Sequence, residues 1–164
     1  MSTAQSTAEH QPAIILRLAT VADIPQLVKL FATFFKESGY APVMEFDPNI
    51  NARWLTTAIR SRHSHYIVAD EGGKIVGLIS YHIDDSFSAK PLAVLGEVYA
   101  LAEYRKSFIG RRLVLAAMDM AKNHSGANCM HIPLSSGHKA MPTLVNLFKK
   151  FGAEEIGVIM RKVL

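Results

Sequence analysis

Residues 97–113 are the stretch of this chain best suited to chemistry, and they read Glu-Val-Tyr-Ala-Leu-Ala-Glu-Tyr-Arg-Lys-Ser-Phe-Ile-Gly-Arg-Arg-Leu. Their pattern predicts a strand, a short basic loop and a helix that begins near Gly110. Amide N–H groups at a helix N-terminus lack intrahelical acceptors and carry partial positive charge, so they bind phosphate. Glycine lets the backbone approach an anion closely. Four cations surround the same point: Arg105, Lys106, Arg111 and Arg112.

Together these features predict an anion site whose natural occupant is a diphosphate. The alternative is a helix start whose basic side chains are only solvated. Neither the Walker A pattern nor the glycine-rich dinucleotide fingerprint occurs in the chain, which disfavours a nucleoside triphosphate or NAD as the ligand.

The charge of the chain is distributed unevenly. Residues 101–164 carry 10 Lys and Arg against 4 Asp and Glu, whereas residues 1–100 carry 8 against 10, for a total of +4. Such an asymmetry indicates a local anion site rather than a uniformly basic surface. No alternation of basic and aromatic residues supports a nucleic-acid platform, so we expect no nucleic-acid partner.

Length and composition predict a single globular domain of 164 residues, 49% hydrophobic and 20% charged. We expect a flexible tail over residues 1–12 and one domain over residues 13–164. No apolar run approaches the roughly 18 residues of a membrane span, and the polar N-terminus does not resemble a secretory signal. The lone Cys129, expected to be inert in the core, indicates a reducing compartment, and we expect a cytoplasmic protein.

Hydrophobic periodicity predicts an α/β domain with the element order β-α-α-β-β-β-α-β-α-β. Thr20 to Asp23 resembles a capping box before the first helix. The expected helices cover residues 24–38, 50–62, 110–123 and 141–150. The expected strands cover residues 14–19, 65–69, 75–83, 92–101, 128–134 and 156–163.

The element order and residues 102–113 resemble the GCN5-related N-acetyltransferase (GNAT) superfamily. Its pyrophosphate motif reads Gln/Arg-x-x-Gly-x-Gly/Ala, and Arg105 and Gly110 match the first and last positions while Phe108 replaces the middle glycine. Residues 147–153, Leu-Phe-Lys-Lys-Phe-Gly-Ala, are similar to the family's "LYxKxGF" segment. The resemblance, which extends from residue 14 to the C-terminus, implies a mixed, mostly antiparallel sheet flanked by helices on both faces.

The resemblance implies acetyl-CoA as the cosubstrate, with its diphosphate on backbone amides of residues 106–111 and its pantetheine along residues 99–101. Phenylalanine disfavours the positive φ that glycine allows, so we expect a loop shifted to lay Phe108 over the cofactor, or a reduced affinity for CoA. The cofactor-binding residues implied are Tyr99, Ala100, Leu101, Arg105, Lys106, Ser107, Phe108, Ile109, Gly110 and Arg111.

The resemblance also places Glu97 where many family members carry a glutamate base, and its apolar neighbours suit a carboxylate to take a proton. The alternatives are an anchor for the substrate amine, or a carboxylate held by a local arginine or by amides. The family's usual acid, a tyrosine, is Phe148 here, and Met141 replaces an asparagine. Either the thiolate leaves unassisted, or Tyr99, Tyr104 or His138 substitutes, or the chain does not catalyse acetylation.

We therefore expect an acyltransferase that moves an acetyl group from acetyl-CoA to a primary amine of a small molecule or peptide. The alternative is a catalytically silent acyl-CoA-binding or protein-interaction module on the same fold. Tyr99 is a candidate for the acceptor site, and the loops over residues 38–48, 84–91 and 134–138 would build it. We expect no metal, because His63 and His65 lie where a strand begins and are expected at the surface. A homodimer is a further option.

Overall fold

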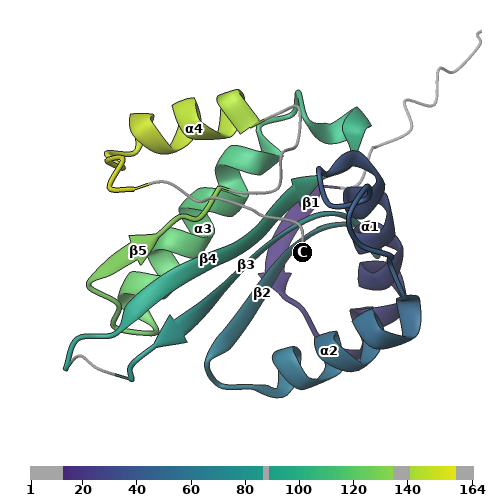
Figure 1. The fold of residues 1–164 in the computed structure, drawn as a ribbon, viewed down its shortest axis with the longest axis horizontal. Coiled ribbons are helices and arrows are strands. Elements are labelled where there is room, and N and C mark those ends of the chain that lie inside the picture. Colours follow the sequence, from purple (N-terminus) through teal and green to yellow (C-terminus); the bar gives the residue numbers. More distant parts are fainter. Residues whose placement is uncertain (1–12, 87–88, 135–140, 158–164) are drawn as a thin grey trace, which may run out of the picture.

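The computed structural model describes residues 13–86, 89–134 and 141–157 (Figure 1). Five strands form one sheet in the order β1-β2-β3-β4-β5, antiparallel except for the parallel pair β4 and β5. The strands are β1 (Ile14–Leu18), β2 (Ser64–Glu71), β3 (Lys74–Asp84), β4 (Leu92–Ala100) and β5 (Cys129–His131). The α-helices are α1 (Ile24–Glu37), α2 (Pro48–Arg60), α3 (Ile109–Asn123) and α4 (Met141–Lys150), with short 3-10 helices η1 (Val21–Asp23) and η2 (Ala102–Tyr104).

Helices cover both faces of the sheet, as the sequence predicts (Figure 1). Successive side chains of a strand point to opposite faces, so neighbouring residues enter different cores. In β2, Tyr66 and Val68 pack with residues of α1 and α2, whereas Ile67 and Ala69 pack with residues of α3 and α4. Each face of the sheet therefore has its own apolar layer.

The predicted elements lie within a few residues of the observed ones, with two exceptions at the C-terminal end. The strand expected over residues 128–134 is reduced to β5, and the expectation that Cys129 is buried is wrong, because the side chain is exposed. Among the described residues β5 pairs only with β4, so it is an edge strand. Most of the strand expected over residues 156–163 and the whole tail over residues 1–12 lie outside the described residues.

Strand β4 changes its neighbours along its length. It pairs with β3 to its end at Ala100, but with β5 only over residues 92–94. Beyond Val94, no strand of the described part of the chain pairs with the outer edge of β4. This edge leads directly into η2 and the start of α3, which positions the site described below.

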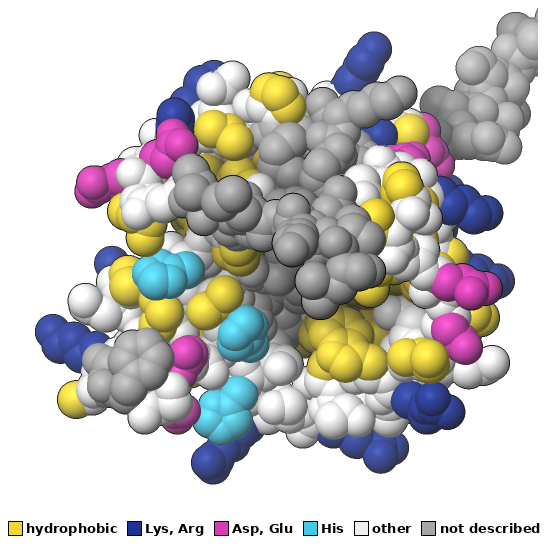
Figure 2. All heavy atoms as spheres, in the orientation of Figure 1, with side chains coloured by type: hydrophobic (Ala, Val, Ile, Leu, Met, Phe, Trp, Pro, Cys, Tyr) yellow, Lys and Arg dark blue, Asp and Glu magenta, His cyan; other side chains and the backbone are white. Residues whose placement is uncertain are grey.

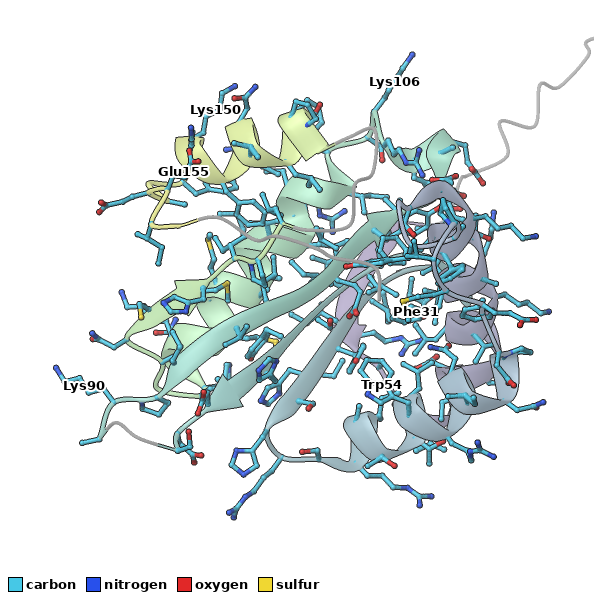
Figure 3. The ribbon with its side chains drawn as sticks, in the orientation of Figure 1. Phe31, Trp54, Lys90, Lys106, Lys150 and Glu155 are labelled. Atoms are coloured by element: carbon cyan, nitrogen blue, oxygen red, sulfur yellow. The ribbon has the colours of Figure 1, made fainter. Side chains whose placement is uncertain are left out.

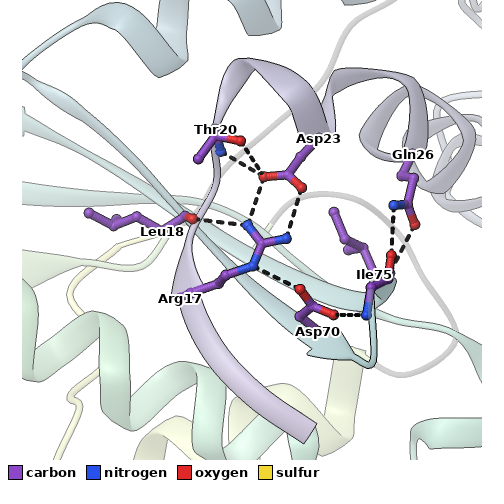
Figure 4. Close-up of polar contacts among 8 residues, drawn as sticks. Arg17, Leu18, Thr20, Asp23, Gln26, Asp70 and Ile75 are labelled. Carbon is purple, nitrogen blue, oxygen red and sulfur yellow. Dashed lines mark hydrogen bonds and ion pairs between the residues drawn. The ribbon is translucent and has the colours of Figure 1, made fainter.

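Arg17 links β1, η1 and β2 through ion pairs (Figure 4). The guanidinium of Arg17 on β1 donates two hydrogen bonds of 2.8 Å to Asp23 in η1 and one of 2.8 Å to Asp70 on β2. Asp23 also accepts from the backbone N–H of Thr20, which closes the predicted capping turn. Arg17 lowers the pKa of Asp23 from 3.8 to about 2, although burial of the carboxylate acts in the opposite direction.

Replacing Asp23 with asparagine is expected to lower the free energy of unfolding by about 2 kcal/mol at pH 7. The folded-state pKa lies below the unfolded-state value, so this stabilisation is complete above pH 4 and is lost as pH falls towards 2. Urea unfolding of both proteins between pH 2 and pH 7 measures it. Asp85→Asn, at a solvent-exposed carboxylate, is the control. An equal deficit for Asp23→Asn at pH 2 and pH 7 would contradict the assignment.

Candidate active site

The end of β4 and the start of α3 carry the residues for which the sequence predicts an anion site. The first hydrogen bond of α3 runs from the N–H of Arg112 to the carbonyl of Phe108. Within the described residues, the amide N–H groups of Ile109, Gly110 and Arg111 have no acceptor. Three donors with the partial positive charge of a helix N-terminus are therefore available to an anion.

Gly110 borders open space at this helix start. A Cβ built on it meets no heavy atom within 4 Å, and its φ is not positive, so neither packing nor backbone geometry demands a glycine there. Glycine at this position instead keeps the backbone accessible from outside, as close approach of a ligand would require.

Phe108 adopts the backbone conformation that its residue type disfavours. Its φ and ψ of 60° and 7° are left-handed, and among the described residues it is the one non-glycine with a positive φ. This conformation costs a non-glycine residue about 1–2 kcal/mol. The loop thus keeps the geometry of a glycine-containing turn, and the ring, 72% exposed, stands at the N-cap of α3.

Two of the four cations in the predicted cluster are held by contacts within the protein, and the other two face solvent. Arg105 turns back, because its Nε donates to the carbonyl of Ala100 and its guanidinium pairs with Glu37 on α1. Arg112 donates to the carbonyl of Ile14. Lys106 and Arg111 are exposed at the helix start, and Figure 3 shows Lys106 pointing away from the body of the protein. Arg105 therefore anchors the loop, whereas Lys106 and Arg111 face solvent.

The other residues predicted to bind the cofactor follow one another from β4 through the loop to the start of α3. Ala100 ends β4, Leu101 is the N-cap of η2, and Ser107 closes the loop with a hydrogen bond from its hydroxyl to the carbonyl of Tyr104. Ile109 is fully buried under the helix start. Tyr99 is buried on the opposite face, where its ring meets Phe34 edge-on.

Glu97 lies at an irregularity of β4 on the sheet face covered by α1 and α2. The register between β3 and β4 shifts so that Ser80 faces both Gly96 and Glu97, which makes a β-bulge. The Ser80 hydroxyl donates to the Glu97 carboxylate over 2.7 Å and accepts from the Glu97 N–H over 2.9 Å. Two hydrogen bonds from one side chain thus orient the half-buried glutamate.

Gly96 makes this contact sterically possible. A Cβ at Gly96 would lie far inside the van der Waals distance of the Ser80 Oγ. The hydroxyl therefore occupies the space that any other residue at this position would fill. Gly96 and Ser80 form a pair that holds the carboxylate of Glu97 at the bulge.

Two tyrosines line the same face of the sheet as Glu97. Tyr66 lies directly opposite Ser80 in the ladder of β2 and β3, and burial together with the charge of Glu97 raises its pKa. Burial and the charge of Glu37 raise the pKa of Tyr99 to about 12. Both phenols therefore keep their protons throughout the physiological range, and Tyr66 is the one electrostatically coupled to Glu97.

The structure shows the surroundings of the side chains considered as general acids. Phe148 is 2% exposed and packs in the core under α3 and α4, and its ring carries no proton. The Tyr104 hydroxyl donates to Glu71 at the β2–β3 turn. His138 lies outside the described residues. Tyr99, packed on Phe34, has its hydroxyl fully buried.

The two histidines flagged by the sequence lie at the start of β2, and His65 is on the sheet face opposite to Glu97. His63 and His65 line a hollow of about 310 Å³ together with Asp85 and His124. His65 stacks on Tyr81 with ring centroids 4.7 Å apart, and burial lowers its pKa. No group of three or more metal-ligating side chains converges among the described residues. Among the helices that the structure describes, none is long and apolar enough to span a membrane.

Sequence reasoning missed Ser80, Tyr66 and Gly96 as parts of the site. Ser80 and Tyr66 are 17 and 31 residues before Glu97 and belong to no motif with it. Only the pairing of β2, β3 and β4 brings them together. A glycine inside a predicted strand, between Leu95 and Glu97, was the one available signal, because such a glycine often marks a bulge.

Comparison with known proteins gives one family match. The model of the acetyltransferase (GNAT) family matches residues 24–153. No curated protein sequence matches the chain.

Solved structures share the whole fold at low sequence identity. A transcriptional regulator from Bacillus halodurans C-125 superposes with a TM-score of 0.74 at 20% identity, covering 92% of this chain and 100% of that one. An aminoglycoside acetyltransferase from an uncultured soil metagenomic sample, in complex with sisomicin, gives 0.71 at 20% identity, covering 92% and 96%. An aminoglycoside N-acetyltransferase in complex with CoA gives 0.74 at 13% identity, covering 94% and 97%. At these identities the likeness establishes the fold.

Proposed function

Because the chain belongs to the acetyltransferase (GNAT) family, we propose that it transfers an acetyl group from acetyl-CoA to a primary amine of a small molecule or peptide. The observation that carries this proposal is Glu97, whose carboxylate Ser80 orients on the strand that leads into a helix start with three available N–H groups. A proton acceptor and an anion site thus lie on one continuous stretch of chain.

The residues at the β4–α3 junction fit the diphosphate of acetyl-CoA. The N–H groups of Ile109, Gly110 and Arg111 donate to it, and Lys106 and Arg111 add two full charges. The pantetheine would follow the outer edge of β4 at Tyr99, Ala100 and Leu101, where no strand of the described residues pairs. The carbonyl of Ala100 accepts from Arg105 and keeps a second lone pair.

Acetyl-CoA supplies the activated acetyl group as a thioester. An alkylamine is an ammonium ion at neutral pH, so it must lose a proton before its nitrogen can attack. Glu97 accepts this proton, and Ser80 keeps the carboxylate in place. The new C–N bond replaces the C–S bond, the thiolate leaves with the electron pair, and the attacking nitrogen loses its second proton to water. Phe148 gives it no proton, and an ordinary thiol pKa near 8.5 makes unassisted departure feasible.

The proposal is tested by two measurements on the full chain. Thermal denaturation with and without acetyl-CoA reports binding, because a ligand of the folded state raises the melting temperature. Release of the CoA thiol with a panel of primary amines reports turnover. Stabilisation together with amine-dependent release supports the proposal, and the absence of stabilisation overturns it.

A catalytically silent acyl-CoA-binding module is the second candidate, and the identity of Phe148 favours it. The position where the family resemblance expects a tyrosine carries a buried phenylalanine. Stabilisation by acetyl-CoA without thiol release on any amine or peptide would establish this alternative.

Replacing Gly110 with alanine is expected to stabilise the free protein by about 0.5–1 kcal/mol and to weaken acetyl-CoA binding about 10-fold. Alanine favours the helix, and its Cβ meets nothing within 4 Å in the protein itself. The same Cβ would occupy the space through which a diphosphate reaches the amides. Urea unfolding and calorimetric titration with acetyl-CoA measure the two effects. Gly157→Ala, also in open surroundings, is the control, and an unchanged affinity in Gly110→Ala would contradict the assignment.

A further inference from the structure

Exposed apolar side chains concentrate beside the face of the sheet that carries Glu97. Ten large apolar residues are exposed among the described ones, and four of them lie within residues 43–54: Val43, Met44, Ile50 and Trp54. They belong to α2 and the loop before it. Figure 2 shows hydrophobic side chains gathered next to α2 on this face. Such a concentration of exposed apolar side chains is typical of a binding region.

Trp54 is the centre of this region. Its ring is 47% exposed and meets two buried rings edge-on, Phe31 at 6.3 Å and Tyr66 at 5.9 Å between centroids. Figure 3 shows Phe31 and Trp54 directed from α1 and α2 towards the sheet. The indole is held rigidly by its neighbours and still presents about half of its surface to solvent.

One tyrosine connects Trp54 to the proposed base. Tyr66 touches Trp54 with its ring and lies opposite Ser80 in the sheet, and Ser80 in turn donates to Glu97. A single tyrosine side chain therefore spans the distance from the indole to the Ser80–Glu97 pair. An arylethylamine has about the same length as that side chain.

The charges around the region do not suit a polycation. Residues 24–60 carry four Lys and Arg against three Asp and Glu. Of these acids, Glu37 pairs with Arg105, and Asp47 accepts from two N–H groups at the start of α2. Of the acids in residues 24–60, Glu45 on the exposed loop then remains, and Glu97 on β4 is the acid of the proposed site. A substrate with several ammonium groups would leave most of them without a carboxylate.

We propose that the acceptor amine is an aromatic monoamine whose ring packs on Trp54 and whose ammonium group reaches Glu97. This inference rests on the proposed acetyl transfer and gives its substrate class. The aromatic surface of Trp54 provides the affinity, because edge-to-face and offset ring contacts add to the burial of apolar area. The carboxylate of Glu97 fixes the position of the amine, since it pairs with one ammonium group.

The test compares 2-phenylethylamine with spermidine and sisomicin as acceptors in the thiol-release assay. We expect kcat/KM to be at least about 10-fold higher for 2-phenylethylamine. Trp54→Ala is expected to raise the KM for this amine about 10- to 30-fold and to leave the KM for acetyl-CoA unchanged, while Trp54→Phe restores most of the affinity. Leu115→Ala, an exposed apolar residue on α3, is the matched control and is expected to change neither KM.

A second readout does not depend on turnover. Trp54 is the one tryptophan of the chain, so quenching of its fluorescence measures amine binding directly, in the presence of CoA as a non-reacting partner. We expect saturable quenching by 2-phenylethylamine and none by spermidine at the same concentration.

The outcomes separate this inference from the proposed function. Faster turnover of spermidine or sisomicin, or an unchanged KM in Trp54→Ala, overturns the aromatic assignment and leaves acetyl transfer standing. Saturable quenching without thiol release on any amine supports the aromatic site and overturns acetyl transfer. The absence of quenching by 2-phenylethylamine overturns the aromatic site.

Discussion

Replacing Glu97 with glutamine is expected to lower kcat for acetyl transfer by about 10²- to 10⁴-fold and to leave acetyl-CoA binding unchanged. Glutamine has the shape of glutamate, and its amide oxygen can still accept the hydrogen bond from Ser80. It cannot take a proton from an ammonium ion. The variant therefore removes the proton acceptor without disturbing the bulge of β4.

The kinetic pattern distinguishes a base from an anchor. A carboxylate that only holds the ammonium group contributes to binding, so its loss raises the KM for the amine and spares kcat. A base is used in the transition state, so its loss lowers kcat. Steady-state kinetics with saturating acetyl-CoA and calorimetric titration with acetyl-CoA together decide between the two roles.

Glu103→Gln is the matched control for this substitution. Glu103 lies in η2, away from the bulge, and its mostly exposed carboxylate is 3.9 Å from the ammonium of Lys74 on β3. We expect this variant to keep the rate of the natural chain. A kcat for Glu97→Gln within a factor of about 3 of the control would contradict the role of Glu97 as the base.

Replacing Gly96 with alanine is expected to lower the free energy of unfolding by about 3 kcal/mol and kcat at least about 10-fold. The added Cβ overlaps the Ser80 Oγ, so the hydroxyl must rotate or the strands must separate. Rotation breaks both hydrogen bonds between Ser80 and Glu97, one of which is made to a charged group. Urea unfolding and steady-state kinetics measure the two effects.

The double variant Gly96→Ala with Ser80→Ala tests whether overlap with the Ser80 hydroxyl causes these losses. Alanine at position 80 removes the Oγ, and the Ser80 Cβ is 3.6 Å from the built Cβ, an ordinary contact. We expect the double variant to be more stable than Gly96→Ala alone, because the overlap is gone. We expect its kcat to stay low, because Glu97 lacks its orienting hydroxyl. Additive losses of stability would show that the two residues do not interact.

The fold could be predicted well from the sequence wherever short-range periodicity determined it. The apolar spacing of α1 and the two short apolar runs on either side of the β2–β3 turn reflect local geometry, so these elements were predicted within a few residues. The prediction failed for β5 and Cys129. Whether a short apolar run is covered depends on its neighbours, and an edge strand of three residues leaves the cysteine exposed.

The resemblance to the GNAT superfamily was predicted from residues 102–113 and is confirmed by the family match. The roles proposed for the individual residues of that segment stay predictions. The structure divides them physically: Arg105 binds back to Ala100 and Glu37, while the amides of Ile109 to Arg111 stay available among the described residues.

The sequence by itself determined the unit of β4, basic loop and α3, on which the predicted anion site rests, because these elements depend on neighbours in the chain. The left-handed backbone of Phe108 is the exception, because the residue type predicts a shifted loop and the structure keeps the positive φ. Only the tertiary structure decided what surrounds Glu97. Ser80 and Tyr66 come from other strands, and Trp54 comes from α2, and the register of the sheet and the packing of that helix bring them together. Such contacts between distant residues leave no periodic signal in the sequence, although the substrate class that we propose depends on them.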